Sequence, residues 1–246
     1  MTAADDPFEP FFVALEARHR RELEFAEIRK GVQAVSSLYV ERRARLDRLF
    51  DGAGKRAAFA MYYGPLHFLT VRGIVHALGT PRVASVLELG CGTAAAGAAW
   101  ALECGARYDG VEQSGRAIDE ARFTLKALRV PGGVRRGDLL RERLPGRGAG
   151  ILLAWTVNEL EDAARADLLT DLLDARARGA AVLVVEPIAR RVSPWWGAWR
   201  SAFEAAGGRA DEWRFPTRLP ATLALLDKAA GLDHRELTAR SLWAPG

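Results

Sequence analysis

The stretch Val86-Leu-Glu-Leu-Gly-Cys-Gly-Thr-Ala-Ala95 decides the fold of this chain. A short apolar segment, a glycine turn and an alanine-rich segment follow one another directly, which predicts a buried strand, a tight turn and a helix. Gly90 and Gly92 permit torsions that other residues rarely adopt and let the backbone approach a ligand closely. The helix start presents free N–H groups that bind a carboxylate or a phosphate. The stretch therefore predicts a ligand-binding turn.

From Arg82 onward, short apolar runs alternate with longer amphipathic stretches, which indicates strand–helix repeats and a parallel sheet. Ser114 and Asp162 are placed to cap two of the helices. The expected strands cover residues 84–89, 108–112, 133–136, 150–155, 180–185 and 236–243. The fold class is therefore α/β, with helices on both faces of the sheet.

The first 80 residues have a helical pattern, in which Ile28, Val32, Val35 and Tyr39 recur at spacings of three and four. Gly64-Pro65 is expected to break this region, because proline is tolerated at the first helical position but not inside a helix. We therefore expect an N-terminal helical cap over residues 1–80 and a second domain over residues 81–246.

Composition restricts the function classes. The chain has 246 residues, 49% of them hydrophobic and 27% charged, and its longest apolar runs are far shorter than the roughly 20 residues that span a bilayer. Its first residues are acidic, so we expect a cytoplasmic protein without a membrane partner. Cys91 and Cys104 are the only cysteines, which excludes a disulfide framework or a four-cysteine zinc site. The four histidines show no metal-binding spacing, so no metal is expected.

The basic balance leaves RNA binding open. The formal charge is +4, and clustered cations bind phosphates by releasing counterions. Arginine supplies nearly all of this charge, a skew that codon composition also explains. Arg42, Arg43, Arg45 and Arg48 form either a phosphate-contacting stripe or a solvated helix face.

Three carboxylates surround the glycine turn in sequence. Glu88 precedes Gly90 by two residues and is a candidate partner, through water or backbone, for a ligand ammonium group. Glu112 ends the second expected strand, where a carboxylate accepts both ribose hydroxyls. Asp138 follows the third strand and can accept from an adenine amine. Together they outline an adenosine linked to an amino acid, although Gly90-x-Gly92-x-x-Ala95 also fits a dinucleotide-binding dehydrogenase.

These residues resemble the class I S-adenosylmethionine-dependent methyltransferases, with Glu88-x-Gly90-x-Gly92 as motif one, Glu112 as the ribose acid and Gly137-Asp138 as the adenine-side loop. The resemblance extends from Arg82 to the C-terminus and implies a Rossmann-like methyltransferase sheet. It implies S-adenosyl-L-methionine as cofactor. The residues expected to hold it are Glu88, Gly90, Cys91, Gly92, Thr93, Glu112, Gln113, Asp138, Leu139, Trp155 and Asn158. Because little chain follows Trp243, the family's final antiparallel strand is expected to be missing.

A narrower resemblance is carried by residues 28–39, 62–69 and 155–160. These segments are similar to the methyltransferase-like proteins of the mitochondrial small ribosomal subunit and their bacterial relatives. That family carries cysteines for an iron–sulfur cluster, and two cysteines cannot supply one. The resemblance therefore implies a shared cap and donor site but leaves a ribosomal role open.

The acceptor side is expected beyond the fourth strand, at Asn158-Glu159. Glu159 is a candidate proton acceptor, although both residues equally suit a helix start. Tyr63 and His67 lie four residues apart, so a helix would place them on one face of the cap, near the transferred methyl. Tyr63, His67 and Glu159 are thus the candidate catalytic residues, with a hydrogen-bonded core histidine as the alternative for His67.

Aromatic residues also cluster at the start of a later helix. Trp195, Trp196, Trp199 and Phe203 share a face, and they either wall an acceptor pocket or pack in the core, with core packing the stronger interpretation.

The sequence thus predicts methyl transfer by direct displacement to an unidentified acceptor, RNA or a small molecule, with no DNA partner expected. The alternative is a non-catalytic S-adenosylmethionine-binding protein that assists ribosome assembly or binds RNA. A nicotinamide dehydrogenase is a more distant third.

Overall fold

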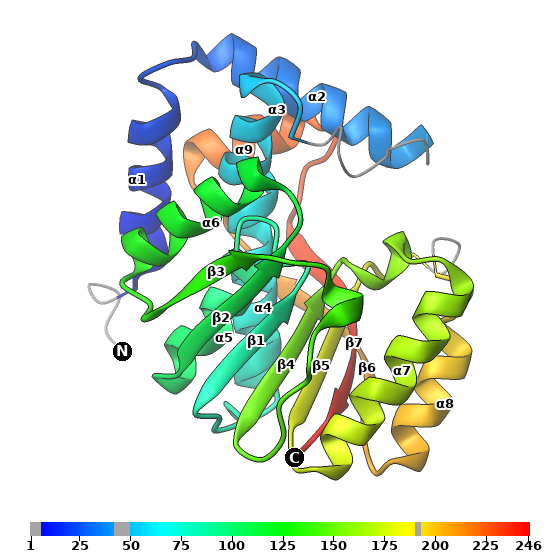
Figure 1. The fold of residues 1–246 in the computed structure, drawn as a ribbon. Coiled ribbons are helices and arrows are strands. Elements are labelled where there is room, and N and C mark those ends of the chain that lie inside the picture. Colours follow the sequence, from blue (N-terminus) through cyan, green and yellow to red (C-terminus); the bar gives the residue numbers. More distant parts are fainter. Residues whose placement is uncertain (1–5, 42–49, 190–192) are drawn as a thin grey trace.

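The computed structural model describes residues 6–41, 50–189 and 193–246, and its centre is one seven-stranded sheet (Figure 1). The strand order is β3-β2-β1-β4-β5-β7-β6. All pairings from β3 to β5 are parallel, whereas β7 is antiparallel to both of its neighbours. The strands are β1 (Ser85–Leu89), β2 (Arg107–Glu112), β3 (Gly132–Arg136), β4 (Ala149–Ala154), β5 (Ala181–Glu186), β6 (Arg209–Pro216) and β7 (Glu236–Ala244).

Helices cover both faces of the sheet, as expected from the sequence (Figure 1). Alternate residues of one strand enter different cores: Leu183 and Val185 pack with one set of helices, and Val182 and Val184 with the other. Burial on both faces explains why β5 is a continuous apolar run. The helices after β1 are α5 (Ala95–Cys104), α6 (Gly115–Leu128), α7 (Asp162–Ala177), α8 (Trp196–Ala205) and α9 (Ala221–Ala229), with short 3₁₀ turns η4 (Leu139–Arg141) and η5 (Val157–Glu159).

The expected absence of a final antiparallel strand was wrong. The strand expected at residues 236–243 is β7, and it runs antiparallel between β5 and β6, a strand that the sequence pattern did not predict. β6 itself was missed, because its residues alternate between exposed and partly buried positions at the sheet edge and form no apolar run. The six expected strands are all present, with bounds shifted by one residue at most ends.

One of the two expected helix caps is confirmed. The Ser114 hydroxyl accepts a hydrogen bond from the Ala117 N–H at the start of α6. Asp162 was the wrong cap for α7, because Glu161 occupies the N-cap position and makes no side-chain capping bond. The Asp162 carboxylate instead accepts from the Arg165 guanidinium at 2.6 Å.

The described part of the N-terminal segment consists of helices joined by short turns and contains no strand. It comprises α1 (Phe8–His19), α2 (Phe25–Glu41), α3 (Ala53–Ala58), the π-helical segment η3 (Phe59–Tyr63) and α4 (Gly64–Ala77). Gly64-Pro65 changes the helix type without breaking the run, since the Gly64 N–H bonds back to the Phe59 carbonyl. This wider turn lies directly before Pro65, which has no N–H to donate.

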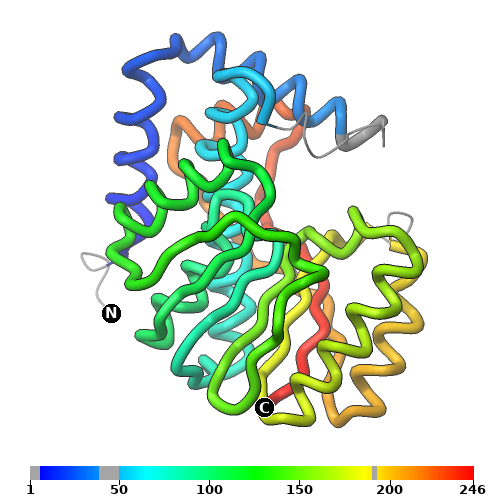
Figure 2. The backbone as a smooth tube through the Cα atoms, in the orientation of Figure 1, coloured from blue at the N-terminus to red at the C-terminus, as the bar shows by residue number. Residues whose placement is uncertain are grey.

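These N-terminal helices share a core with one face of the sheet. Ile28, Val32 and Val35 are fully buried in the same cluster as Val86 of β1. The buried Glu120 carboxylate on α6 faces His19 of α1, and its nearest oxygen lies 3.2 Å from His19 Nε2. Figure 2 shows the blue and cyan N-terminal segment beside the orange segment of α9, where the Ser36 hydroxyl donates to the Ala230 carbonyl.

Three sequence expectations concern the arginine stripe, membrane-spanning helices and metal-binding side chains. Arg42, Arg43, Arg45 and Arg48 lie outside the described residues. Among the described residues, no helix has the length and apolar character needed to cross a membrane, and no three metal-binding side chains come together.

Candidate functional site

The turn after β1 combines left-handed backbone with tight anchoring. Gly90 and Gly92 have φ values of +70° and +51°. The N–H groups of Gly90 and Cys91 both donate to the Val111 carbonyl of β2, at 2.9 and 3.0 Å. A Cβ on Gly92 would meet nothing within 4 Å, so the chain leaves open space above this glycine. Two backbone hydrogen bonds to β2 therefore anchor the turn, while the space that a side chain of Gly92 would occupy is open.

Glu112 ends β2 beside this turn, as the sequence predicts. Its Oε2 accepts the Gly92 N–H at 2.9 Å, and its Oε1 accepts the Ser114 N–H at 2.9 Å. Each carboxylate oxygen can accept more than one hydrogen bond, so both keep capacity for a hydroxyl. Gln113 follows and is exposed.

The segment after β3 contributes Asp138 and Leu139. The Asp138 carboxylate accepts the Leu140 N–H at 3.1 Å and so starts the turn η4. Leu139 reaches the glycine turn, since a Cβ on Gly90 would lie 3.5 Å from its Cδ2. An apolar side chain and a carboxylate thus lie at the end of β3.

These groups line one edge of the sheet in strand order. They lie at the carboxyl ends of β3, β2 and β1, which are consecutive neighbours, and β4 is the next strand of the sheet. The chain reverses its direction of travel across the sheet between β1 and β4. Ligands of open parallel sheets bind at such a switch point.

Glu88 has a different environment from the one that its sequence position suggests. Its side chain is buried, and its Oε2 accepts the Tyr108 hydroxyl at 2.5 Å and the Gly97 N–H at 3.1 Å. Burial raises the pKa of Glu88 to about 8 and also raises the pKa of the neighbouring Cys91 thiol. In this structure Glu88 fixes α5 to β2, and its expected contact with a ligand remains a prediction.

The end of β4 meets the N-terminal helices. Trp155 has a φ of +56°, which is rare for a bulky residue and occurs mainly at functional or strained positions. Its ring stacks on the His67 ring, with centroids 3.8 Å apart and planes 8° apart. Nearby, a Cβ on Gly64 would lie 3.0 Å from the Thr93 Oγ1, so the start of α4 contacts motif one. The start of α4 thus contacts both the residue after β4 and the glycine turn after β1.

Tyr63 and His67 do lie on one side of the helical run, with ring centroids 6.4 Å apart. Burial lowers the pKa of His67 to about 3 and raises the pKa of Tyr63. His67 is therefore a neutral ring at physiological pH, and Tyr63 is a neutral phenol. Neither is prepared to act as a strong base.

Both polar atoms of the Asn158 amide bond to other side chains of the protein. Its Nδ2 donates to the Glu186 carboxylate at 2.6 Å, and its Oδ1 accepts from the Trp195 indole at 2.9 Å. Glu186 is fully buried at the end of β5, also accepts the Val157 N–H, and has its pKa raised to about 8 by burial. Asn158 lies inside the 3₁₀ turn η5 and does not cap α7. Glu159 lies at the surface, and partial desolvation raises the pKa of its carboxyl.

Sequence reasoning missed Glu186, Tyr108 and Thr156. Glu186 had a signal, because a carboxylate ends an otherwise apolar strand. Thr156 had none: its hydroxyl lies 3.4 Å from the Gly90 carbonyl only because β4 and β1 are neighbours. The residues of the tryptophan cluster have two environments. Trp199 and Phe203 pack in the core, which was the stronger interpretation of the sequence, whereas Trp195 is half-buried beside Asn158.

Comparison with known proteins identifies the fold. No protein-family model and no curated protein matches the chain. A solved structure titled mitomycin 7-O-methyltransferase MmcR is similar over 98% of this chain and 73% of its own, with 15% identity and a TM-score of 0.53. A SAM-dependent methyltransferase from Aquifex aeolicus is similar over 73% of this chain and 90% of its own, with 14% identity and a TM-score of 0.50. Together with the strand order, these similarities show that the chain has the Rossmann-like fold of class I methyltransferases.

Proposed function

We propose that this protein is an S-adenosyl-L-methionine-dependent methyltransferase. One observation supports this most strongly: the Glu112 carboxylate, anchored by the Gly92 and Ser114 N–H groups, lies between the glycine turn of β1 and the Asp138 segment of β3. This is the order in which an adenosine and its amino-acid tail would meet the sheet edge. The similarity to solved methyltransferases of the same fold supports the same assignment.

The residues present fit the cofactor. Gly92 has open space where a side chain would stand, and the Glu112 oxygens retain acceptor capacity for two hydroxyls. Leu139 offers an apolar surface for a base, and Asp138 offers an acceptor for an exocyclic amine. Thr93, Cys91 and Gln113 would complete the site from the two loops. Glu88 would act indirectly, by holding Gly97 and thereby the start of α5.

When bound, S-adenosylmethionine would supply a methyl group on a positively charged sulfur, which an acceptor nucleophile can displace. The protein's contribution is orientation, which supplies up to roughly 7–11 kcal/mol in well-aligned reactions. The His67–Trp155 stack fixes the relative position of α4 and β4, and so shapes the edge of the site.

No strong base is required in this account. His67 has a pKa of about 3, and the pKa of Tyr63 is raised, so both serve as neutral walls or hydrogen-bonding groups. Glu159 is the remaining candidate proton acceptor, because its carboxyl is near the surface and its pKa is raised. An acceptor whose nucleophile is already deprotonated would need none of them.

We also propose that residues 1–80 act as a cap on the methyltransferase domain of residues 81–246. His67 against Trp155 and Gly64 against Thr93 support a cap that completes the site. The contact of His67 with Trp155 joins residues 62–69 to residues 155–160. Both segments carry the narrower resemblance to the ribosomal methyltransferase-like proteins. A non-catalytic donor-binding role would use the same residues.

Turnover separates the two functions. Purified protein is incubated with methyl-tritiated donor and with fractionated RNA or metabolites from cells that lack the gene. Incorporation of label into one fraction, abolished by Glu112→Ala, supports the enzyme. Tight donor binding without label transfer to any fraction contradicts turnover and favours the binding role.

A further inference from the structure

A continuous set of aromatic rings connects the N-terminal helices to the end of β4. The ring centroids of Phe50 and Phe59 lie 4.7 Å apart, and those of Phe59 and Tyr63 lie 5.1 Å apart. The contacts continue from Tyr63 to His67 at 6.4 Å and from His67 to Trp155 at 3.8 Å. Phe50 and Phe59 are buried, whereas the other three rings are partly exposed. We call Tyr63, His67 and Trp155 the aromatic wall, because a ligand can reach them.

The aromatic wall borders the glycine turn of the proposed donor site. Helix α4 carries His67 and begins at Gly64, where an added Cβ would lie 3.0 Å from the Thr93 Oγ1. Trp155 directly precedes a threonine whose hydroxyl donates to the Gly90 carbonyl at 3.4 Å. Both sides of the wall are therefore fixed next to the turn after β1, where an acceptor has to meet the donor.

The charge state of the wall indicates what kind of acceptor it suits. Burial lowers the pKa of His67 to about 3 and raises the pKa of Tyr63, so both rings are neutral at physiological pH. Among the described residues, no arginine or lysine stacks on His67 or Trp155. Aromatic faces and edges attract another planar ring more than they attract an aliphatic group of the same size. The wall therefore favours an uncharged planar ring.

His67 indicates which substituent the ring carries. A neutral imidazole has one N–H donor and one lone pair that accepts a hydrogen bond. Neither nitrogen of His67 hydrogen-bonds to another residue of the described part of the chain. A hydroxyl or amine on the acceptor can bond to this imidazole, and it also has the lone pair that methyl transfer requires.

We propose that the aromatic wall binds the methyl acceptor, and that this acceptor is a planar aromatic ring with a hydroxyl or amine substituent. The inference rests on the proposed methyltransferase function and adds the chemical class of its acceptor. A lone pair of the substituent forms the new bond to the methyl carbon, the donor sulfur keeps the electrons of the broken bond, and the substituent's proton leaves to water. Free aromatic compounds and nucleobases both supply such a ring.

The test compares planar and saturated ligands by saturation-transfer difference NMR titration of the full chain. The probes are 2-naphthol and decahydro-2-naphthol, which share a carbon skeleton and a hydroxyl but differ in planarity. We expect 2-naphthol to bind at least about fivefold more tightly, the lower limit of what ring stacking contributes. Cytidine is the third probe, because it presents an amine-bearing ring on a ribose. Tighter binding of cytidine than of 2-naphthol supports a nucleobase as the source of the ring, and the reverse supports a free aromatic compound.

Variants of Trp155 locate the binding on the wall. Trp155→Asn removes the ring, and asparagine tolerates the left-handed backbone of this position better than most residues. It should weaken binding of 2-naphthol at least about fivefold, whereas Trp155→Phe keeps a ring and should stay within about threefold of the parent. The matched control is Trp213→Asn, which removes a partly exposed indole from the edge strand β6 and should bind as the parent does.

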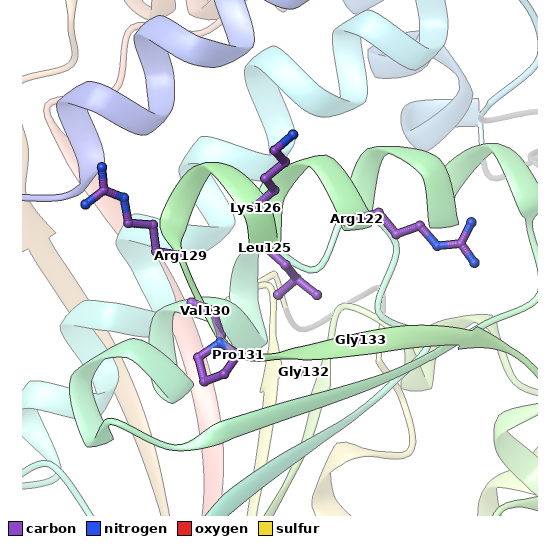
Figure 3. A pocket seen from close by; sticks show the side chains of 8 residues that line it. All are labelled: Arg122, Leu125, Lys126, Arg129, Val130, Pro131, Gly132 and Gly133. Carbon is purple, nitrogen blue, oxygen red and sulfur yellow. The ribbon is translucent and has the colours of Figure 1, made fainter.

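The same variants exclude binding elsewhere on the molecule. The groove between α6 and the start of β3 is lined by cations, aliphatic side chains and glycines and contains no aromatic ring (Figure 3). A probe bound in that groove would not respond to Trp155→Asn. Equal binding of the planar and saturated probes, or equal effects of Trp155→Asn and Trp213→Asn, would overturn the proposal.

A titration of the parent with S-adenosylmethionine separates this proposal from the proposed function. Donor binding without a preference for the planar probe would refute the acceptor class and leave the methyltransferase assignment standing. Absence of donor binding would refute that assignment, and with it the role of the wall as an acceptor site.

Discussion

The Oε2 of Glu112 lies 2.9 Å from the Gly92 nitrogen, so the acid that ends β2 and the second glycine of the β1 turn form one unit. The other oxygen, Oε1, holds the Ser114 N–H at the start of α6. One carboxylate therefore orients both loops at the centre of the sheet edge. Any ligand that binds there meets a preorganised acceptor.

Replacing Glu112 should weaken donor binding. Glu112→Ala removes up to two charge-assisted hydrogen bonds to hydroxyls and the two bonds that orient the loops, and each charge-assisted bond contributes about 1.5–3 kcal/mol. We expect a loss of at least about tenfold in equilibrium dialysis with tritiated S-adenosylmethionine. Glu112→Gln retains one acceptor oxygen and should lose less. Equal donor affinity of the parent, Glu112→Ala and Glu112→Gln would show that Glu112 does not bind the ribose hydroxyls.

Gly90 and Gly92 should differ in their tolerance of a side chain. Gly92→Ala places a Cβ in open space and should cost only the left-handed strain of about 1–2 kcal/mol. Gly90→Ala places a Cβ 2.6 Å from the Thr156 Cγ2 and should cost about 1–3 kcal/mol more in urea unfolding. Adding Thr156→Ser removes that methyl and should recover part of the loss. No recovery would mean that the clash does not control this position.

Residues of the proposed cap should affect turnover more than donor affinity. Tyr63→Phe and His67→Ala leave the glycine turn and Glu112 intact, so kcat should fall while the donor dissociation constant changes little. Because the pKa of His67 is about 3, no His67 titration should appear in the rate profile between about pH 5 and 8. An inflection near the ordinary histidine pKa that disappears in His67→Ala would contradict the neutral ring. Deleting residues 1–55 is a poorer test, because it would remove buried core residues such as Phe11 and Ile28 and expose the side chains that pack against them.

Glu88 should make stability depend on pH. Its pKa is about 8 in the fold and 4.5 as its ordinary value, so the fold binds a proton that the unfolded chain releases in this range. The contribution of the buried carboxyl to the free energy of unfolding is therefore fully present below about pH 4.5 and is lost as the pH rises through about 8. Relative to Glu88→Gln, the parent should lose more than about 1 kcal/mol of unfolding free energy between pH 5 and 9. Parallel urea titrations measure this difference, with exposed Glu204→Gln as the control; a constant difference between parent and Glu88→Gln would contradict the account.

The sequence predicts the sheet edge well because its signals are local. The glycine turn, Glu112 and Asp138 each lie at the carboxyl end of a strand that the sequence pattern predicts, and parallel strands bring their carboxyl ends together. The strand β6 escaped detection because an exposed edge strand alternates polar residues and needs β7 as a partner to form. The Glu186–Asn158–Trp195 network and the His67–Trp155 stack join residues far apart in the chain, and only strand order and helix packing define such pairs.

Calorimetric titration of the full chain, with S-adenosylmethionine and with NAD in parallel, tests the central claim most directly. Both ligands could meet a glycine turn and an acid at the end of β2, so the choice between them is decisive. We predict saturable binding of one S-adenosylmethionine per chain and no measurable heat with NAD. Binding of NAD without binding of S-adenosylmethionine, or binding of neither, would contradict the assignment of this sheet edge as a methyl-donor site.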